Sequence, residues 1–336
     1  MIEVKDLTKN YGPVKAVCGV SFTIEKGRVY GLLGVNGAGK STVMNIMTGC
    51  LSPTSGTVTV DGHDIYEDAI EAKKKIGYLP EVPPLYPDMT PREYLRFIAK
   101  AKKIKTNRKA EIERVSRICG IADVSDRLIK TLSKGYRQRV GIAGALVGDP
   151  EVIILDEPTV GLDPIQLIEI RTLISSLRED HAIVISSHVM SEIAAVCDRI
   201  IIMAYGKVVA EGSLDELEES RRGRTVTVTS TGKYNDYKKI KEILSAVEGV
   251  DYVLTYPRGA KVRSVVETKE GCDAAESVKE ALVSHGEEVT ETVTAKVSLE
   301  DIFIRLTTVA AEERAREEAE DGEVPLPGIS EGGDEK

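Results

Sequence analysis

The sequence predicts an α/β protein with a parallel core sheet, an antiparallel β-subdomain, an inserted α-helical subdomain and a small C-terminal α+β domain. Continuous apolar runs at residues 152–155 and 183–185 predict core strands, because a strand covered by helices on both faces has no polar side. Helix signals fill residues 90–148. After residue 224, strand and helix patterns alternate in the manner of a separate α+β domain.

The composition is typical of a globular protein with room for two domains. The chain has 336 residues, of which 42% are hydrophobic and 29% are charged. No apolar run approaches the roughly eighteen residues of a membrane helix, and residues 1–6 do not begin a signal peptide. We therefore expect a cytoplasmic protein. Its five cysteines are widely spaced and form no C-x-x-C pair, which predicts reduced thiols rather than disulfides or a structural zinc site.

Most of the net charge of −9 lies at the C-terminal end of the chain. Residues 311–336 hold ten acidic and three basic side chains, so the rest of the chain is nearly neutral. A surface that binds nucleic acid by charge is therefore not expected. Acidic residues mixed with proline and glycine are typical of disordered segments, and we expect residues 308–336 to form a disordered acidic tail.

The first elements are short strands. Residues 2–7, 17–24 and 56–60 alternate apolar and polar side chains, which predicts the antiparallel β-subdomain. Tyr11 lies in the turn region between the first two of these strands. Taken alone, its ring either stacks on an adenine base or simply packs within the protein, and both interpretations stay open.

A phosphate-binding loop follows the apolar strand predicted at residues 29–33. The loop reads G-x-x-x-x-G-K-S, the P-loop pattern, and a helical pattern follows it. Glycines let backbone N–H groups approach phosphate oxygens, and the N-terminus of the helix attracts the same anion. Lys40 is expected to reach the β- and γ-phosphates, and Ser41 to bind Mg²⁺. The predicted ATP-binding residues of this loop are Gly34, Val35, Asn36, Gly37, Ala38, Gly39, Lys40, Ser41 and Thr42.

Two segments with polar signals lie between the loop and the next core strand. One strand ends at Glu81, beside a Pro-rich loop. In the helical subdomain, Thr90 and Glu93 form a capping-box pattern at the start of a helix. A later helix has Ser133 as its N-cap, so the Ser133 hydroxyl and the Gly135 N–H are two donors near its positive end.

Carboxylates and a histidine follow the two core strands. Asp156 and Glu157 end the strand 152–155, at the edge where α/β sheets place ligand chemistry. Asp156 is in position to hold Mg²⁺ through water, and Glu157 to orient or deprotonate an attacking water. Without a preceding P-loop, two solvated acids would be the favoured interpretation. His188 ends the strand 183–187 and either reaches the γ-phosphate or only begins the next helix.

The segment after the charged run 216–224 predicts a ferredoxin-like α+β domain. It shows no catalytic constellation, so a dimerisation or regulatory role is favoured. An amphipathic helix follows from residue 298. The expected elements are strands at 225–229, 250–255, 262–267 and 289–295 and helices at 234–247 and 273–284.

Taken together, these motifs resemble the ATP-binding subunit, or nucleotide-binding domain, of ABC transporters. The P-loop, an L-S-x-G segment at 132–135, the Asp-Glu pair, a G-L-D segment at 161–163 and the strand-end histidine occur in that order. The resemblance covers about residues 1–220 and implies a P-loop NTPase with a RecA-like core sheet. A domain at 224–307 and the tail at 308–336 lie beyond it. The extension resembles that of the branch that serves drug, polysaccharide or gliding-type exporters.

The resemblance implies a role for each motif residue. Within one copy, Tyr11 would stack on adenine, Asp156 would belong to the magnesium site, and Glu157 would be the catalytic base. Glu81 would lie in the loop that senses Mg²⁺ and the membrane partner. His188 would be the γ-phosphate switch, and Asp163 would lie in the dimer-interface loop. The signature segment, which would act on a second copy, would comprise Ser133, Lys134, Gly135 and Tyr136.

Two positions depart from the family pattern. The signature usually reads L-S-G-G-Q, and here Lys134 and Tyr136 replace a glycine and the glutamine. The sensing loop usually carries glutamine, and here it carries Glu81. Because the serine and Gly135 remain, phosphate contact is expected to survive. Glu81 is expected to alter Mg²⁺ affinity, and is the more consequential of the two departures.

The resemblance also implies how the protein works. Two copies would enclose two ATP molecules, and hydrolysis would open the dimer and drive a membrane partner. That partner is expected to be a separate polytopic permease, which would place the chain on the inner face of the cell membrane. The alternative is a soluble ABC-type ATPase that acts as a switch on a ribosome or on DNA machinery. Such proteins usually carry two ATPase modules or a coiled-coil insertion, and neither occurs here. A third hypothesis is a nucleotide-binding regulator without turnover.

Overall fold

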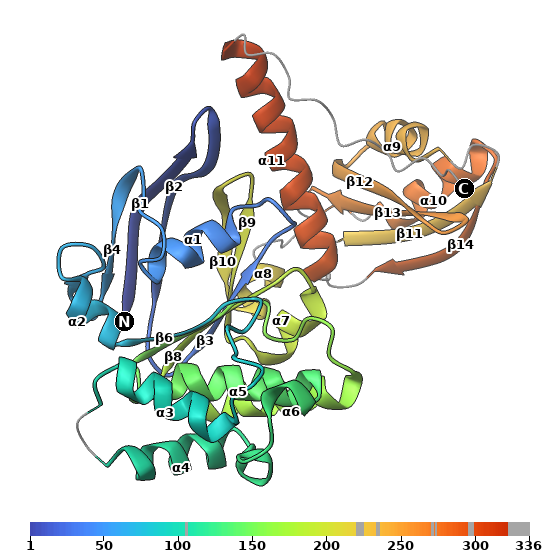
Figure 1. Cartoon of the computed structure of the whole chain (residues 1–336). Coiled ribbons are helices and arrows are strands. Elements are labelled where there is room, and N and C mark those ends of the chain that lie inside the picture. Colours follow the sequence, from blue (N-terminus) through green and yellow to red (C-terminus); the bar gives the residue numbers. More distant parts are fainter. Residues whose placement is uncertain are drawn as a thin grey trace, which may run out of the picture. The chain divides into compact units, whose positions relative to one another are not determined.

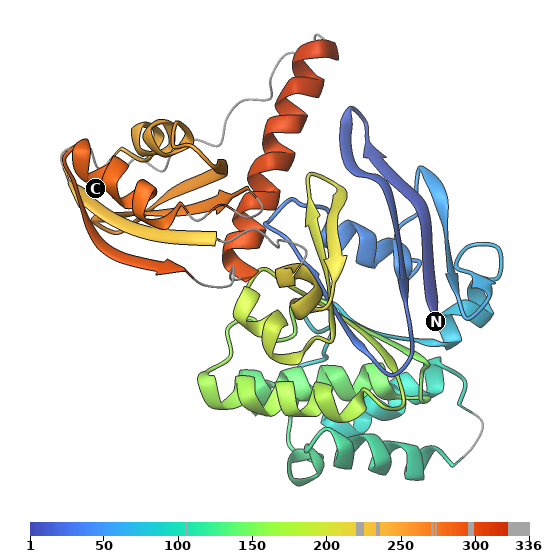
Figure 2. The ribbon, with the colours of Figure 1, turned by 180° about the vertical axis from the view of Figure 1, so that it is seen from behind.

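The computed structural model describes residues 1–104, 107–219, 225–232, 236–269, 272, 274–294 and 299–321. The chain divides into two compact units (Figures 1 and 2). Unit 1 comprises Met1–Glu211 and the described residues from Leu306 onward, and unit 2 comprises Gly212–Arg305. The division therefore lies at Gly212, a few residues before the boundary expected at 220, because the short helix α8 (Leu214–Glu219) groups with unit 2.

The N-terminal β-subdomain of unit 1 is a four-stranded sheet with the order β2-β1-β4-β5. Its paired neighbours are antiparallel, as the alternation of apolar and polar side chains predicts. Its strands are β1 (Ile2–Tyr11), β2 (Val14–Ile24), β4 (Ser55–Val60) and β5 (His63–Asp64).

The core sheet has six strands in the order β10-β9-β3-β8-β7-β6. The pairs β3–β8, β3–β9, β7–β8 and β6–β7 are parallel, so the carboxyl ends of these strands meet at one edge. Every residue of β3, β7 and β8 is buried, which confirms the prediction from their apolar runs. The strands are β3 (Val29–Leu33), β6 (Ile76–Leu79), β7 (Val152–Leu155), β8 (Ala182–Ser187), β9 (Arg199–Ala204) and β10 (Lys207–Gly212).

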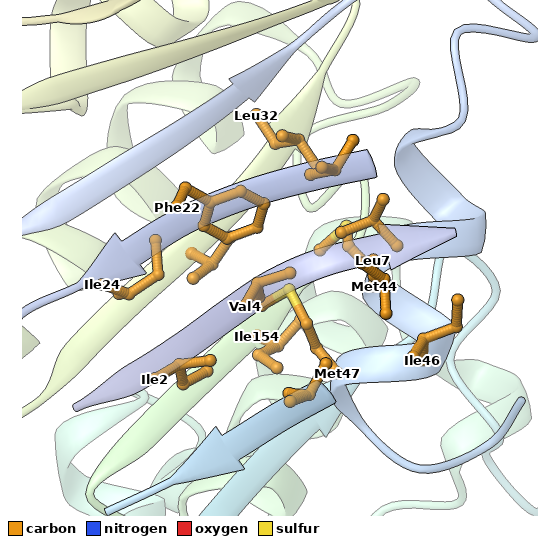
Figure 3. Packing of buried hydrophobic residues seen from close by; sticks show 14 of the residues in the cluster. Ile2, Val4, Leu7, Phe22, Ile24, Leu32, Met44, Ile46, Met47 and Ile154 are labelled. Carbon is orange, nitrogen blue, oxygen red and sulfur yellow. The ribbon is translucent and has the colours of Figure 1, made fainter. Parts of the chain in front are cut away.

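Helix α1 (Lys40–Met47) packs in one hydrophobic cluster with strands of both sheets. Figure 3 shows Met44, Ile46 and Met47 of this helix among side chains from β1, β2, β3 and β7. The labelled partners are Ile2, Val4, Leu7, Phe22, Ile24, Leu32 and Ile154. Because burial of each such side chain contributes roughly 1.5–3 kcal/mol, this cluster holds the start of α1 rigidly at the edge of the core sheet.

Helices α3 and α5 of unit 1 begin at the caps that the sequence predicts, Thr90 and Ser133. Thr90 Oγ1 accepts from the N–H of Glu93 at 3.2 Å, and the Glu93 carboxylate accepts from the N–H of Thr90 at 2.9 Å. This is the predicted capping box. Helix α4 (Arg108–Ile118) also lies in the segment 90–148, where the sequence shows helix signals. The helices are α2 (Ala69–Lys74), α3 (Pro91–Ala101), α4 (Arg108–Ile118), α5 (Lys134–Leu146), α6 (Pro164–Leu177) and α7 (Met190–Val196).

Unit 2 has the predicted order of strands and helices, β-α-β-β-α-β. Its sheet has the order β12-β13-β11-β14, and its neighbouring strands are antiparallel, the arrangement of a ferredoxin-like motif. One apolar cluster joins the sheet to its two helices. The elements are β11 (Thr225–Gly232), α9 (Tyr237–Ser245), β12 (Val250–Arg258), β13 (Lys261–Thr268), α10 (Ala275–Ser284) and β14 (Glu287–Thr294).

Helix α11 (Leu299–Asp321) corrects the expected start of the acidic tail. Residues 308–321 are helical rather than disordered, because alanine, glutamate and arginine, which dominate this stretch, have high helix propensities. Within unit 1, the guanidinium of Arg314 lies 5.3 Å from the centre of the Tyr205 ring, a cation–π contact. The rest of the expected tail, residues 322–336, lies outside the described residues.

None of the helices in the described part of the chain combines the length and the apolar character that crossing a bilayer requires.

Candidate functional site

The phosphate-binding loop joins β3 to α1 with two residues in the left-handed region. Gly37 has φ +82° and Gly39 has φ +103°, backbone conformations that residues with a Cβ rarely adopt. A Cβ on Gly39 would also lie only 2.7 Å from the carbonyl oxygen of Ala16. The chain therefore needs glycine at Gly39 for both conformation and space. A Cβ on Gly37 would meet nothing within 4 Å.

Lys40 points back into this loop from the first turn of α1. Its Nζ donates to the carbonyl oxygens of Gly34 at 2.7 Å and Val35 at 3.2 Å. Burial lowers the pKa of Lys40, and the nearby carboxylates of Glu157 and Asp156 oppose that shift. An ammonium group has three N–H donors, so it can serve these carbonyls and an anionic ligand together.

The turn between β9 and β10 supports the same loop. The N–H of Gly206 donates to the carbonyl oxygen of Ala38 at 3.0 Å, and the carbonyl oxygen of Gly206 accepts from the N–H of Cys18 at 2.8 Å. These bonds connect the loop to a turn of the core sheet and to β2 of the antiparallel sheet. The position of the loop is thus fixed from outside as well as by its own glycines.

Asp156 and Glu157 leave the end of β7 and are held by Ser186 at the end of β8. Ser186 Oγ donates to Asp156 Oδ1 at 2.6 Å and accepts from the N–H of Glu157 at 2.8 Å. Ser186 is fully buried and Asp156 nearly so. A single hydroxyl therefore sets the orientation of one carboxylate and the backbone of the other.

Glu157 and His188 face each other across the ends of these two strands. His188 Nδ1 lies 3.0 Å from Glu157 Oε1. Glu157 has φ +46°, a left-handed conformation that is uncommon for a residue with a side chain and often marks a functional site. Its second oxygen, Oε2, is buried and has no hydrogen-bond partner in the described part of the chain. A buried carboxylate oxygen is normally paired, so this atom is available to a ligand.

The phosphate-binding loop, Glu157 and His188 line one pocket of about 400 Å³, a volume within the usual range for a ligand site. Apart from Ala16 and Val160, every lining residue was predicted from the sequence. The lining residues are Ala16, Asn36, Gly37, Gly39, Lys40, Ser41, Thr42, Glu81, Glu157, Val160 and His188.

Tyr11 does not line this pocket. It is the last residue of β1, 48% of its surface is exposed, and the Lys9 ammonium lies 5.3 Å from the centre of its ring. The Tyr11 ring therefore lies partly exposed beside a cation at the β1–β2 turn. The predicted contact of Tyr11 with adenine stays a prediction.

The signature segment also lies outside the pocket of its own chain. Ser133 is the N-cap of α5, and its Oγ accepts from the N–H of Tyr136 at 3.3 Å. The hydroxyl of Tyr136 donates to Asp123 Oδ2 at 2.9 Å. Ser133 and Lys134 are exposed, whereas Gly135 is buried.

The start of α6 lies against this segment. Asp163 Oδ1 caps α6 by accepting from the N–H of Gln166 at 2.9 Å. A Cβ on Gly135 would come within 3 Å of the Gln166 side chain, and one on Gly161 would collide with the Lys134 ammonium. The predicted signature and interface-loop residues are therefore neighbours.

Sequence reasoning missed Ala16, Val160 and Ser186. Ala16 contributes through its backbone, which no side-chain motif signals. Ser186 is a polar residue at the end of a buried apolar strand, and this position could have indicated a partner on the neighbouring strand. In the described part of the chain, no group of three or more His, Cys, Asp or Glu side chains could hold a metal.

Residues 17–160 match the family model described as ABC transporter. The bacitracin transport ATP-binding protein BcrA of Bacillus licheniformis is 33% identical over 308 residues, which are 91% of this chain and 97% of that protein. The ABC transporter ATP-binding protein NatA of Bacillus subtilis is 41% identical over 229 residues, 66% of this chain and 93% of that protein.

A solved structure of an ATP-binding cassette is also similar. It is the dimeric, post-hydrolysis state of the cassette with bound ADP and phosphate. Its sequence is 28% identical, the TM-score is 0.58, and the match covers 64% of this chain and 99% of that one. Together with the phosphate-binding loop and the carboxylates at one pocket, these similarities show that the chain belongs to the ATP-binding subunits of ABC transporters and is an ATPase.

Proposed function

We propose that this chain binds ATP with Mg²⁺ in the pocket at the ends of β3, β7 and β8, and that two copies hydrolyse it to power a separate membrane permease. One observation carries the proposal. The phosphate-binding loop and the Glu157–His188 pair line one pocket, while the signature segment of the same chain does not. Such a site has a binding loop and a base of its own, and can take its remaining donors from a second copy.

The loop fits a triphosphate. Gly37 lines the pocket, and a Cβ there would project into open space, so its backbone N–H can approach an anion without obstruction. α1 begins at Lys40 without a side-chain cap, which leaves the N–H groups of its first turn for phosphate oxygens. Lys40 supplies the positive charge.

The residues present also fit Mg²⁺. Ser41 lines the pocket, and Asp156, which follows β7 directly before the pocket residue Glu157, is oriented by Ser186. A hydroxyl and one carboxylate are a sparse oxygen donor set, which suits an ion that keeps several waters and binds phosphate oxygens. Bound there, Mg²⁺ would neutralise charge on the β- and γ-phosphates. Glu81 also lines the pocket and would contact that ion or its waters.

Glu157 is proposed as the base and His188 as the residue that senses the γ-phosphate. The unpartnered Glu157 Oε2 can accept a proton or a hydrogen bond from the attacking water, while Oε1 is held by His188. His188 Nδ1 is engaged by Glu157, and the other ring nitrogen can reach the γ-phosphate. Tyr11 is proposed to stack on the adenine base from the β1–β2 turn.

Dimerisation would bring the signature segment to the pocket of a second copy. Ser133 and Gly135 lie at the N-terminus of α5, where backbone N–H groups and the helix dipole attract a phosphate. Asp163 begins the neighbouring helix α6 and would lie at the interface. The dimeric state of the similar cassette supports this arrangement.

The proposed transport reaction is export. BcrA is named for bacitracin transport, and another similar protein, LnrL of Bacillus subtilis, for linearmycin resistance. We infer a permease encoded as a separate chain, with this subunit peripheral on the inner face of the membrane and unit 2 as an accessory domain. The comparisons do not favour a switch on ribosomes or DNA.

The test is the Glu157→Gln substitution, which removes the carboxylate and keeps the shape of the side chain. We expect ATP turnover to fall by about a thousandfold, since the step loses its base, while ATP binding persists. ATP should then hold the variant as a dimer, as measured by size-exclusion chromatography with light scattering.

Glu169→Gln provides the matched control, because Glu169 pairs with Arg139 away from the pocket and its loss should leave turnover unchanged. Turnover of Glu157→Gln at the wild-type rate, with no dimer in ATP, would overturn the proposal.

A further inference from the structure

The pairing of β7 with β8 stops short of the Glu157–His188 pair. The register of β7 and β8 ends with Leu155 opposite Ile185, and both residues of the pair lie beyond that point. Their 3.0 Å contact therefore depends on what fixes two segments, the turn after β7 and the end of β8, whose last residue, Ser187, pairs with Leu33 of β3.

One carboxylate oxygen joins these two segments. Glu192 Oε2, on α7, accepts from Thr159 Oγ1 at 2.5 Å and from Ser187 Oγ at 3.1 Å. Thr159 lies two residues after Glu157, and Ser187 directly precedes His188. The two hydrogen bonds to Glu192 thus connect the same two segments that the Glu157–His188 contact connects.

Burial makes these hydrogen bonds strong and difficult to replace. Thr159 is 7% exposed and Ser187 is 1% exposed, so neither hydroxyl can turn to bulk water without a change of structure. Hydrogen bonds to a carboxylate are roughly twice as strong as those between neutral groups. Ser187 Oγ also accepts from the N–H of Val189 at 3.0 Å, which fixes the segment that carries His188.

Ser186 does not connect the same two segments as Glu192. It holds the N–H of Glu157 and the carboxylate of Asp156 at the strand ends, but it does not reach the turn that contains Thr159 or the backbone of His188. Glu192 is the group that spans both of these.

We propose that Glu192 is a positioning residue for hydrolysis, which keeps His188 against Glu157 by tying Thr159 to Ser187. It does not line the pocket, so it acts through these partners and not on the nucleotide. The inference rests on the proposed roles of Glu157 and His188.

The test is steady-state ATP turnover by the full chain with Glu192→Ala and Glu192→Gln. A misplaced catalytic group costs up to about a hundredfold in rate, so we expect kcat of Glu192→Ala to fall by about ten- to a hundredfold with KM for ATP within about twofold. Glu192→Gln should retain most of kcat, because an amide oxygen can accept both hydroxyl hydrogens. Ser191→Ala, at an exposed neighbour on α7, should match the wild type.

A double-mutant cycle separates positioning from general damage to the fold. If Glu192 acts through His188, Glu192→Ala should change kcat by less than about twofold in a His188→Ala background. Thr159→Val removes one donor while it keeps the shape of the side chain, and it should lower kcat in the same direction. This variant serves as the test if Glu192→Ala does not fold.

Wild-type turnover in both Glu192→Ala and Thr159→Val would overturn the inference. So would an equal loss from Glu192→Ala with and without His188, or a Gln variant no better than the Ala variant. The Glu157→Gln result distinguishes failure of the proposed role of Glu192 from failure of the proposed role of Glu157. If that variant stops turnover while Glu192→Ala does not, only the inference fails; if it turns over normally, the assignment of the base fails.

Discussion

At the scale of single residues, the pocket is made by backbone as much as by side chains. Gly39 shows this most clearly, since both its φ of +103° and the nearby Ala16 carbonyl exclude a Cβ. Glu157 accepts a similar backbone conformation although it has a side chain. Such a conformation costs on the order of 1 kcal/mol or more, and the hydrogen bond from its N–H to Ser186 helps to hold it.

Gly39→Ala is expected to weaken ATP binding by at least about tenfold. The added methyl group must displace the Ala16 carbonyl or the loop itself, and the left-handed conformation adds strain of about 1 kcal/mol. Isothermal titration calorimetry with ATP measures the loss.

Gly259→Ala is the matched control for Gly39→Ala. It has φ +65° but no atom within 4 Å of the added Cβ, and it lies in unit 2. It should lose stability without losing ATP affinity. Equal ATP affinity for Gly39→Ala and the wild type would show that the loop tolerates a Cβ.

At the scale of elements, a partly buried lysine, the C-cap of α3, connects this helix to the end of α5. Lys102 Nζ donates to the carbonyl oxygens of Val147 at 2.8 Å and Ala145 at 3.3 Å. Burial lowers its pKa to about 8, and Glu111 opposes the shift only in part. The charged form is thus less stable in the folded chain than in the unfolded chain, whose lysine pKa is about 10.4.

This shift predicts a pH dependence of stability. Between the folded and unfolded pKa values the unfolded chain binds more protons, so the contribution of Lys102 to stability rises as pH increases from about 8 to about 10. Relative to Lys102→Met, the wild type should therefore gain about 2 kcal/mol in free energy of unfolding between pH 7 and pH 9.5. Urea unfolding at both pH values measures the gain.

Lys100→Met, at an exposed lysine of the same helix, is the control for this experiment. Its difference from the wild type should not change with pH. A difference between wild type and Lys102→Met that stays constant over the same range would contradict the lowered pKa.

The elements that position the site could be predicted because their signals are local. The P-loop glycines, the apolar run before Asp156 and the capping box at Thr90 each occupy a few adjacent residues. The hydrogen bonds from Ser186 to Asp156 and from Thr159 to Glu192 could not be predicted in the same way, since the partners lie about thirty residues apart and no pattern links such positions.

The C-terminal half of α11 shows a second limit of prediction from the sequence. The acidic character of residues 308–321 indicated disorder, whereas the helix propensity of the same alanines, glutamates and arginines indicated a helix, and the helix is what forms. Composition alone did not decide between the two, because charge-rich segments are typical of both.

At the scale of the whole molecule, the C-terminal part contributes to two units. Asp301 on α11 accepts a hydrogen bond from the Tyr256 hydroxyl at 2.8 Å within unit 2. Arg314, on the same helix, lies against Tyr205 within unit 1. Tyr205 precedes Gly206, whose N–H supports the phosphate-binding loop at Ala38, so the helix contacts the turn that holds the site.

The exposed signature segment predicts complementation between defective copies. In the proposed dimer, Lys40→Ala would damage the pocket that belongs to its own chain, and Ser133→Ala would damage the pocket of the partner. In a mixed dimer, the intact loop of one chain would face the intact signature of the other. ATP turnover of an equal mixture should therefore exceed that of either variant alone by several-fold, as measured after exchange of subunits at high concentration.

A mixture of Lys40→Ala with Glu157→Gln is the control, because each mixed dimer would then have a defect in both pockets. Turnover of the first mixture at the average of its components would mean that a pocket is complete within one chain.

The exposure of Ser133 at the start of α5 thus has a genetic consequence. In the proposed dimer each copy would carry parts of two different catalytic centres, so the phenotype of a mutation would depend on the allele that accompanies it. Two alleles that are each inactive alone would then restore transport together, provided that their lesions fall on opposite sides of the shared pocket.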